Sequence, residues 1–197
     1  GGHPVYTRGE EIGFDTREPV EDVARIMAGY HSIIAARVFD HATVERAAAA
    51  LDADGTEVPV VNMLSDRSHP LQAFADALTM RQRLGVLTGQ TVAYVGDYAN
   101  VARSLAEISL LLGMHVRLGC PRGFDADDAE LERLSTIGTG TIEQVTRAAE
   151  AAAPRAADPR RTRTLLRRAR LIRRRAASSS SRGSTAPASR RRCSRWP

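Results

Sequence analysis

A histidine and a glutamine three residues apart form the most distinctive polar arrangement in this sequence. The stretch SDRSHPLQAFAD (65–76) places His69, Pro70 and Gln72 at the start of a segment with helical spacing. Proline suits the first turn of a helix, where unpaired N–H groups attract anions. An imidazole N–H and an amide NH2 there are donors for a carbonyl or phosphate oxygen. The alternative interpretation is a helix start whose histidine caps backbone groups.

Arg37 is a second candidate because it ends the apolar run SIIAAR (32–37). In open α/β sheets, ligands bind at the carboxyl ends of strands, and a guanidinium there suits a planar oxyanion or carboxylate. An ordinary surface arginine is the alternative.

The turn GDYAN (96–100) directly follows the apolar run TVAYV, at the kind of strand-to-helix turn where α/β proteins contact ligands. It lacks the G-x-G-x-x-G pattern, so a dinucleotide site is not supported. Asn100 is the candidate ligand contact, and the alternative is that it caps the following helix.

These residues are embedded in alternating strand-like and helix-like segments. Apolar or β-branched runs predict strands, and apolar residues at helical spacing predict helices between them. The strands are expected at 32–37, 58–64, 91–97, 114–120 and 141–145, and the helices at 41–55, 69–84, 100–112 and 125–138. Gly55 and Gly85 are plausible helix stops. The pattern predicts an α/β fold with parallel sheets, in which the helix from His69 joins two lobes.

The charge is distributed unevenly. Residues 151–197 contain 15 arginines and one acidic residue, whereas residues 1–150 contain 13 arginines and 22 acidic residues. The net charge of +5 therefore divides into an acidic body and a basic, Arg/Ser-rich tail, which we expect to be disordered. Such a tail attracts phosphate without sequence selectivity.

Several classes of protein are disfavoured by composition. No apolar run reaches membrane-spanning length, and the first residues lack the layout of a signal peptide. Cys120 and Cys193 show no metal-ligand spacing and do not suggest a disulfide framework. We therefore expect a cytoplasmic protein without a metal.

Together, the three candidate sites support a resemblance to a known family. Residues 1–41, the HPLQAFAD segment, and YVGDYANVARSLAEISLLLGMHVRLGCPRGF are similar to the ornithine carbamoyltransferases, and the similarity runs over roughly residues 1–150. The family signature His–Pro–x–Gln–x–x–Ala–Asp is matched from His69 to Asp76, with Phe74 where leucine is usual.

The resemblance implies transfer of a carbamoyl group from carbamoyl phosphate to the δ-amine of ornithine, which gives citrulline and phosphate in arginine biosynthesis. It implies that Arg37, His69 and Gln72 bind carbamoyl phosphate and that Asn100 contacts ornithine. Donors fixed at the carbamoyl oxygen stabilise the negative charge that builds there, so Arg37 and His69 are the expected catalytic residues. No cofactor is expected, because carbamoyl phosphate is already activated.

The resemblance also predicts the domain organisation. We expect a partial carbamoyl phosphate-binding domain at 1–68, an inter-domain helix at 69–85, a partial ornithine-binding domain at 86–150 and the tail at 151–197. The family forms homotrimers, which is the expected assembly.

Some family motifs are missing from this sequence. The Ser–Thr–Arg–Thr phosphate loop does not occur in it, nor do the Thr–Asp–Thr strand, the Ser–Met–Gly loop and the His–Cys–Leu–Pro segment. In the GDYAN turn, Ala99 replaces the first of two adjacent asparagines. We therefore expect both lobes to be incomplete and negligible citrulline production from these 197 residues alone.

One hypothesis accounts for the tail. One choice of codons for Arg161–Thr164, read in a shifted frame, encodes Tyr-Thr-Asp-Thr, the kind of strand that the family places at about this point. We therefore hypothesise that the residues after about 150 are a frameshifted translation. Two rival interpretations of the chain are a non-catalytic remnant and a nucleic-acid-binding protein with a basic tail. The second is disfavoured because the acidic body shows no basic or aromatic stripe.

Overall fold

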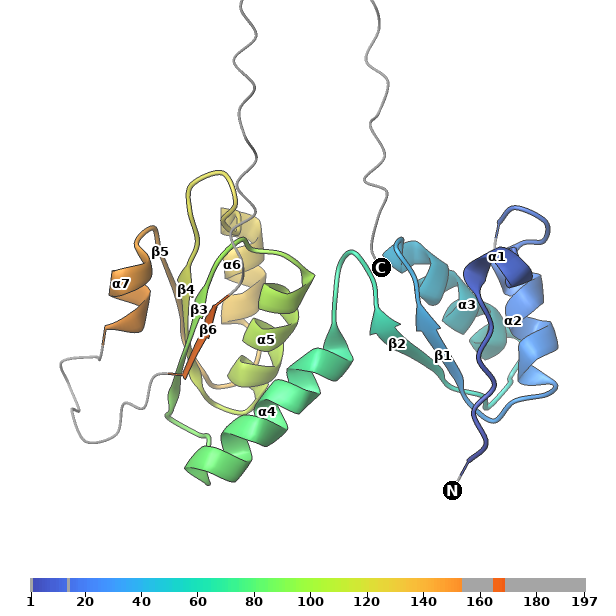
Figure 1. Ribbon diagram of the computed structural model, residues 1–197, viewed down its shortest axis with the longest axis horizontal. Coiled ribbons are helices and arrows are strands. Elements are labelled where there is room, and N and C mark those ends of the chain that lie inside the picture. The colour runs from blue at the N-terminus through green and yellow to red at the C-terminus, as the bar shows by residue number, and fades with distance from the viewer. Residues whose placement is uncertain (1, 14, 154–164, 169–197) are drawn as a thin grey trace, which may run out of the picture.

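The first lobe is a two-stranded parallel sheet covered on one face by two helices. The computed structural model describes residues 2–13, 15–153 and 165–168 of the chain. In this lobe it contains, in chain order, α1 (Gly9–Ile12), α2 (Val20–Ala28), β1 (Ile34–Arg37), α3 (His41–Ala53) and β2 (Val60–Leu64). Helices α2 and α3 pack on each other and on the sheet (Figure 1). The small core consists of Val20, Ala24, Ile34, Ala47 and Leu51.

The second lobe is a four-stranded parallel sheet. Its elements are α4 (Pro70–Leu84), β3 (Thr91–Val95), α5 (Asn100–Leu111), β4 (His115–Gly119), α6 (Asp128–Ser135), β5 (Ile142–Val145), α7 (Ala148–Ala152) and β6 (Leu165–Arg168). The strand order is β5-β4-β3-β6, and every pairing is parallel. The buried strand β3 sits in the middle, with Val92, Ala93 and Tyr94 at most 4% exposed. These pairings confirm the α/β fold with two parallel sheets.

Helix α4 joins the two lobes, as the sequence predicted. It begins with Pro70 as its first helical residue and ends at Gly85, whose φ of 77° suits glycine. Its buried residues Ala77 and Met80 belong to the core of the second lobe, where α4 packs along α5. Helix α4 also contacts β2 of the first lobe, so it is the physical link between the two sheets (Figure 1).

Four described elements were not predicted: α1, α2, α7 and β6. Helix α2 carries Glu21 and Asp22 in its first turn and buries Val20, Val23 and Ala24 on one face, a helical pattern that was present in the sequence but overlooked. Helix α7 overlaps the start of the range expected to be disordered, and strand β6 lies within that range. The backbone of β6 pairs in parallel with β3, so at these four residues the expectation was wrong.

The remaining predictions for the tail fall outside the described residues. The residues outside the described ranges include Arg161–Thr164, on which the frameshift hypothesis rests, and the range 169–197.

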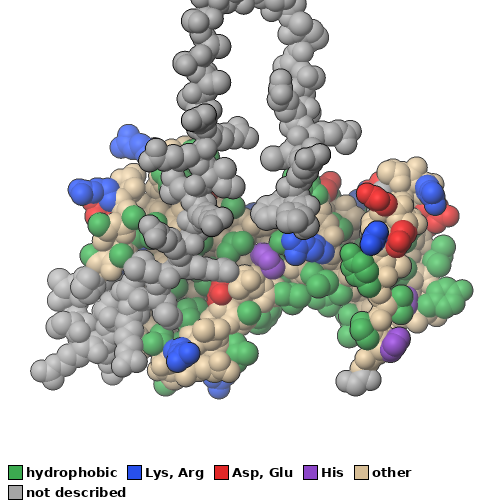
Figure 2. All heavy atoms as spheres, viewed as in Figure 1, with side chains coloured by type: hydrophobic (Ala, Val, Ile, Leu, Met, Phe, Trp, Pro, Cys, Tyr) green, Lys and Arg blue, Asp and Glu red, His purple; other side chains and the backbone are tan. Residues whose placement is uncertain are grey.

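The surface of the described residues includes many large apolar side chains. Phe74 and Leu78 on α4 are 65% and 57% exposed, and Ile33 beside β1 is 60% exposed. Figure 2 shows hydrophobic side chains at the surface in the region between the lobes. Of the helices in the described ranges, none has the length and hydropathy needed to cross a membrane.

Candidate functional site

The turn from Ser65 to His69, between β2 and α4, lies where the two lobes meet. The Asn100 side chain donates from Nδ2 to the Ser65 carbonyl oxygen at 2.7 Å. The backbone N–H of His69 donates to Ser104 Oγ at 2.9 Å. Both ends of the turn are therefore attached to α5 of the second lobe.

Arg37 lies at the same edge of the first sheet as this turn. It is the last residue of β1 and pairs with Leu64, the last residue of β2, after an irregularity between Ala36 and Arg37. Its side chain is exposed, and among the described residues it has no hydrogen-bond or ion-pair partner. An arginine in this position is available to an anionic ligand.

His69 occupies the N-cap position of α4, but its side chain does not cap the helix. The backbone angles are φ −131° and ψ 66°, and no side-chain capping bond is formed. The alternative in which the imidazole caps backbone groups is therefore wrong. The residue is partly buried at the helix start, where the unpaired N–H groups of the first turn favour an anion.

Gln72 lies one turn into α4 and is oriented by a neighbour. Its Nε2 donates to Asp76 Oδ1 at 3.0 Å, four residues further along the helix. A primary amide has two N–H groups, so this bond occupies only one of them.

Asn100 is the first residue of α5 and does not cap it. The N-cap residue is Ala99, which makes no side-chain capping bond. The capping alternative for Asn100 is therefore wrong. Its side chain instead reaches across to the first lobe, which no periodicity in the sequence indicated.

A polar network in the first lobe, missed from the sequence, holds the other side of the turn. His41 Nδ1 lies 2.8 Å from the buried Ser65 Oγ, and Asn62 Nδ2 donates to Ser68 Oγ at 2.8 Å. The backbone N–H of Ser65 donates to the Ser68 carbonyl at 2.9 Å. The only sign of this network in the sequence was the presence of polar residues in and beside a short strand. Their contacts become apparent only when the structure places β2 beside α3.

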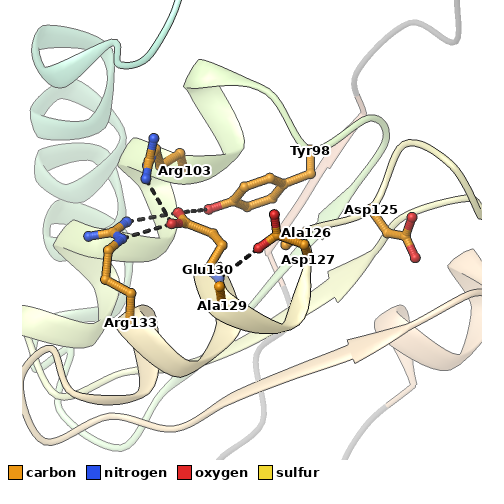
Figure 3. A pocket seen from close by; sticks show the side chains of 8 residues that line it. All are labelled: Tyr98, Arg103, Asp125, Ala126, Asp127, Ala129, Glu130 and Arg133. Atoms are coloured by element: carbon orange, nitrogen blue, oxygen red, sulfur yellow. Dashed lines mark hydrogen bonds and ion pairs between the residues drawn. The ribbon is translucent and has the colours of Figure 1, made fainter.

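Two cavities are each lined in part by Arg103 of α5. The larger, about 470 Å³, lies between the GDYAN turn, α5 and α6 and is lined by Tyr98, Arg103, Asp125, Ala126, Asp127, Ala129, Glu130 and Arg133 (Figure 3). A smaller one, about 240 Å³, is lined by His41, Glu45, Arg67, Ser68, Arg103 and Glu107.

The larger cavity is dominated by the carboxylate of Glu130, on which three side chains converge (Figure 3). The Tyr98 hydroxyl donates to it at 2.6 Å, Arg103 at 2.7 Å and Arg133 at 2.8 Å. The hydrogen bonds from Arg133 and then Tyr98, opposed by burial, lower the pKa of Glu130 from 4.5 to about 2. Burial and the bond to Glu130 raise the pKa of Tyr98. The two arginines balance the charge of the Glu130 carboxylate, and Tyr98 links it to the turn. The cluster therefore anchors the GDYAN turn to α6.

A metal site is not indicated in the part of the chain that the structure describes. Within residues 2–13, 15–153 and 165–168, no group of three or more His, Cys, Asp or Glu residues is arranged to bind a metal ion.

Two family models match consecutive parts of the chain. The model "Aspartate/ornithine carbamoyltransferase, carbamoyl-P binding domain" matches residues 1–82, and "Aspartate/ornithine carbamoyltransferase, Asp/Orn binding domain" matches residues 88–158.

Similar curated proteins have the same family name. The ornithine carbamoyltransferase of Thermus thermophilus is 47% identical over 139 residues, which cover 71% of this chain and 44% of that protein. The chloroplastic ornithine carbamoyltransferase of Pisum sativum is 39% identical over 144 residues, covering 73% of this chain and 37% of that protein. The chain thus spans less than half the length of these relatives.

Solved structures support the same assignment. The Thermus thermophilus ornithine carbamoyltransferase aligns with a TM-score of 0.62 and 45% identity over 73% of this chain and 47% of its own. The Pyrococcus furiosus enzyme aligns with a TM-score of 0.69 and 35% identity over 77% of this chain and 48% of its own. Sequence, family models and fold therefore agree that the chain belongs to the aspartate/ornithine carbamoyltransferase family.

Proposed function

We propose that these residues form part of an ornithine carbamoyltransferase site, which transfers the carbamoyl group of carbamoyl phosphate to the δ-amine of ornithine. The observation that carries the proposal is the position of His69. It begins the helix joining the lobes, and its backbone is bonded to α5 one turn beyond Asn100. The two lobes match the models for the two substrate-binding domains of the family.

In the proposed site, Arg37 and His69 donate hydrogen bonds to carbamoyl phosphate and stabilise the charge that develops on its carbonyl oxygen. Gln72, whose amide is oriented by Asp76, aligns the carbamoyl group. Asn100 contacts ornithine at the opposite side of the junction. Asn100 donates one amide N–H to the Ser65 carbonyl, which orients the side chain and leaves its second N–H and its Oδ1 for ornithine.

The proposed chemistry needs only these donors and an already activated substrate. The neutral δ-amine attacks the carbonyl carbon, and a C–N bond forms. The C–O bond to phosphate then breaks, phosphate leaves with the electron pair, and the amine nitrogen loses one proton. The products are citrulline and inorganic phosphate.

Assembly and location are further parts of the proposal. We place the reaction in arginine biosynthesis in the cytoplasm, consistent with the buried, unpaired thiol of Cys120. A homotrimer would cover part of the exposed apolar surface that includes Ile33, Phe74 and Leu78. Sedimentation equilibrium tests the trimer directly.

The activity is tested in a full-length background. Residues 1–150 replace the matched segment of the Thermus thermophilus relative, which supplies the rest of a complete enzyme. The ureido product, citrulline from ornithine or carbamoyl aspartate from aspartate, is measured colorimetrically with carbamoyl phosphate as the donor. We expect citrulline formation from ornithine and no reaction with aspartate.

Single substitutions in this chimera test the assigned residues. Arg37→Ala and His69→Ala are each expected to lower kcat by about 10²–10³-fold, because each removes a transition-state donor. Arg122→Ala is the matched control, an exposed arginine that also follows a strand. A folded chimera without ornithine-dependent turnover, or one equally impaired by Arg122→Ala, would contradict the proposal.

A further inference from the structure

We propose that Ser104 is a positioning residue for His69 and acts as a pair with Asn100. The two side chains form a clamp, defined here as Asn100 and Ser104, that holds both ends of the Ser65–His69 turn against α5. The assignment of His69 as a substrate donor rests on the proposed function, but the clamp itself rests on the geometry alone.

The clamp follows from helical spacing. Asn100 and Ser104 are four residues apart on α5, so their side chains project from the same face. Asn100 Nδ2 donates to the Ser65 carbonyl at 2.7 Å, and Ser104 Oγ accepts from the His69 N–H at 2.9 Å. Ser65 is fully buried and Ser104 is 4% exposed, so water does not readily replace either bond.

The bond to Ser104 acts on the backbone that carries the imidazole. As the N-cap residue, His69 has an N–H that the helix itself does not use. Pro70 restricts the backbone of His69 from the C-terminal side. Ser104 restrains it from the N-terminal side, and together they set the direction of the Cα–Cβ bond. The imidazole of His69 is thereby oriented relative to the second lobe.

The first lobe holds the same turn from the opposite side. The hydroxyl of Ser65 lies 2.8 Å from His41 Nδ1, and the Asp66 N–H donates to the Phe39 carbonyl at 2.7 Å. Phe39 is two residues beyond Arg37. The turn is thus fixed to both lobes, so the clamp sets the position of His69 relative to Arg37.

The chain provides a matched control on the same helix. Ser109 of α5 is fully buried, and its hydroxyl has no hydrogen-bond partner among the described residues. Ser104→Ala and Ser109→Ala therefore remove the same atom from the same helix in similarly buried positions. Only the first removes a bond to His69.

The test uses the full 197-residue chain and NMR-detected hydrogen exchange. We expect Ser104→Ala to accelerate exchange of the His69 amide by about tenfold and to shift the His69 imidazole resonances. Ser109→Ala should change neither, and Ser104→Thr, which keeps the acceptor oxygen, should restore the amide protection. Asn100→Ala should accelerate exchange in the Ser65–His69 turn. Unchanged His69 signals in Ser104→Ala, or equal changes in Ser109→Ala, would overturn the clamp.

A titration with carbamoyl phosphate separates this inference from the proposed function. We expect Ser104→Ala to weaken the chemical-shift response of the His69 imidazole by about tenfold in apparent Kd, and Ser109→Ala to leave it unchanged. Because the 197 residues lack the phosphate loop, this titration is made in the chimera. Failure of the unsubstituted chimera to respond contradicts the proposed function, whereas the exchange data still decide the clamp. A normal response in Ser104→Ala would reject a positioning role for Ser104.

Discussion

The hydroxyl of Tyr98 donates to a carboxylate oxygen of Glu130 at 2.6 Å, and this bond ties the GDYAN turn to α6. Arg103 of α5 and Arg133 of α6 donate to the same carboxylate. The turn that presents Asn100 is thus held by a charged cluster on the side facing α6. On the side facing the first lobe, it contributes Asn100 to the clamp.

Tyr98→Phe is expected to lower the free energy of unfolding by about 1.5 kcal/mol, because it removes a hydrogen bond to a charged group. Urea denaturation measures the change. Tyr30→Phe is the matched control, since Tyr30 is 82% exposed, and it should have no measurable effect. Equal effects of the two substitutions would show that the Glu130 bond does not stabilise the fold.

Stability is expected to depend on the ionisation of Glu130. Its pKa is about 2 in the folded protein and 4.5 when unperturbed, so folding favours the carboxylate. Its contribution is complete above about pH 4.5 and is lost as the pH falls toward 2. Glu130→Gln should reduce the acid dependence of urea midpoints in this range. If the urea midpoints of Glu130→Gln fell with pH as steeply as those of the unsubstituted protein, the role assigned to Glu130 in acid stability would be contradicted.

Ala99→Asn is expected to stabilise the protein. Ala99 is the N-cap residue of α5, has extended backbone angles of φ −129° and ψ −173°, and makes no capping bond. An asparagine there accepts from the first turn of the helix and should add about 1 kcal/mol to the free energy of unfolding. Ala49→Asn, at an exposed interior position of α3, is the control and should be slightly destabilising. A loss of stability in Ala99→Asn would show that this turn cannot accept the cap.

The thiol of Cys120 is expected to react slowly in the folded protein. Burial, with smaller contributions from Asp125 and Asp97, raises its pKa from 9 to about 11. The thiolate fraction at neutral pH is then about a hundredfold lower than for an ordinary thiol. In a Cys193→Ser background, a colorimetric thiol reagent should react slowly until denaturant is added. Rapid reaction without denaturant would contradict this environment.

The 197 residues by themselves are expected to form negligible citrulline. They lack the Ser–Thr–Arg–Thr loop that the family uses for phosphate, and each lost transition-state donor costs about 10²–10³-fold in rate. The citrulline assay is applied to the purified 197-residue chain and to the chimera in parallel. Turnover by the chain comparable to that of the Thermus thermophilus relative would overturn this expectation.

Most secondary structure was predictable from local pattern. The strands at β1 to β5 and the helices at α3 to α6 follow from apolar periodicity, which is a property of neighbouring residues. Pro70 and Gly85 mark the bounds of α4 because their backbone preferences are intrinsic. Strand β6 was missed because its arginines disguise a segment that pairs at the edge of the sheet.

The candidate site, like the secondary structure, was predictable from the sequence only in part. Arg37, His69, Gln72 and Asn100 were identifiable from residue type and from their places at the ends of strands and the starts of helices. Their partners were not. Ser104 and Tyr98 contact residues 35 and 32 positions away, respectively, and no local pattern encodes such pairings.

By itself, therefore, the sequence determined the family and the α/β elements, and it supplied the candidate donors of the proposed site. Only the tertiary structure decided that Asn100 and Ser104 hold the two ends of the turn before α4, and that Glu130 anchors the turn before α5. Local preferences act between neighbouring residues along the chain. Hydrogen bonds across a lobe junction depend on how two separately formed cores pack against one helix.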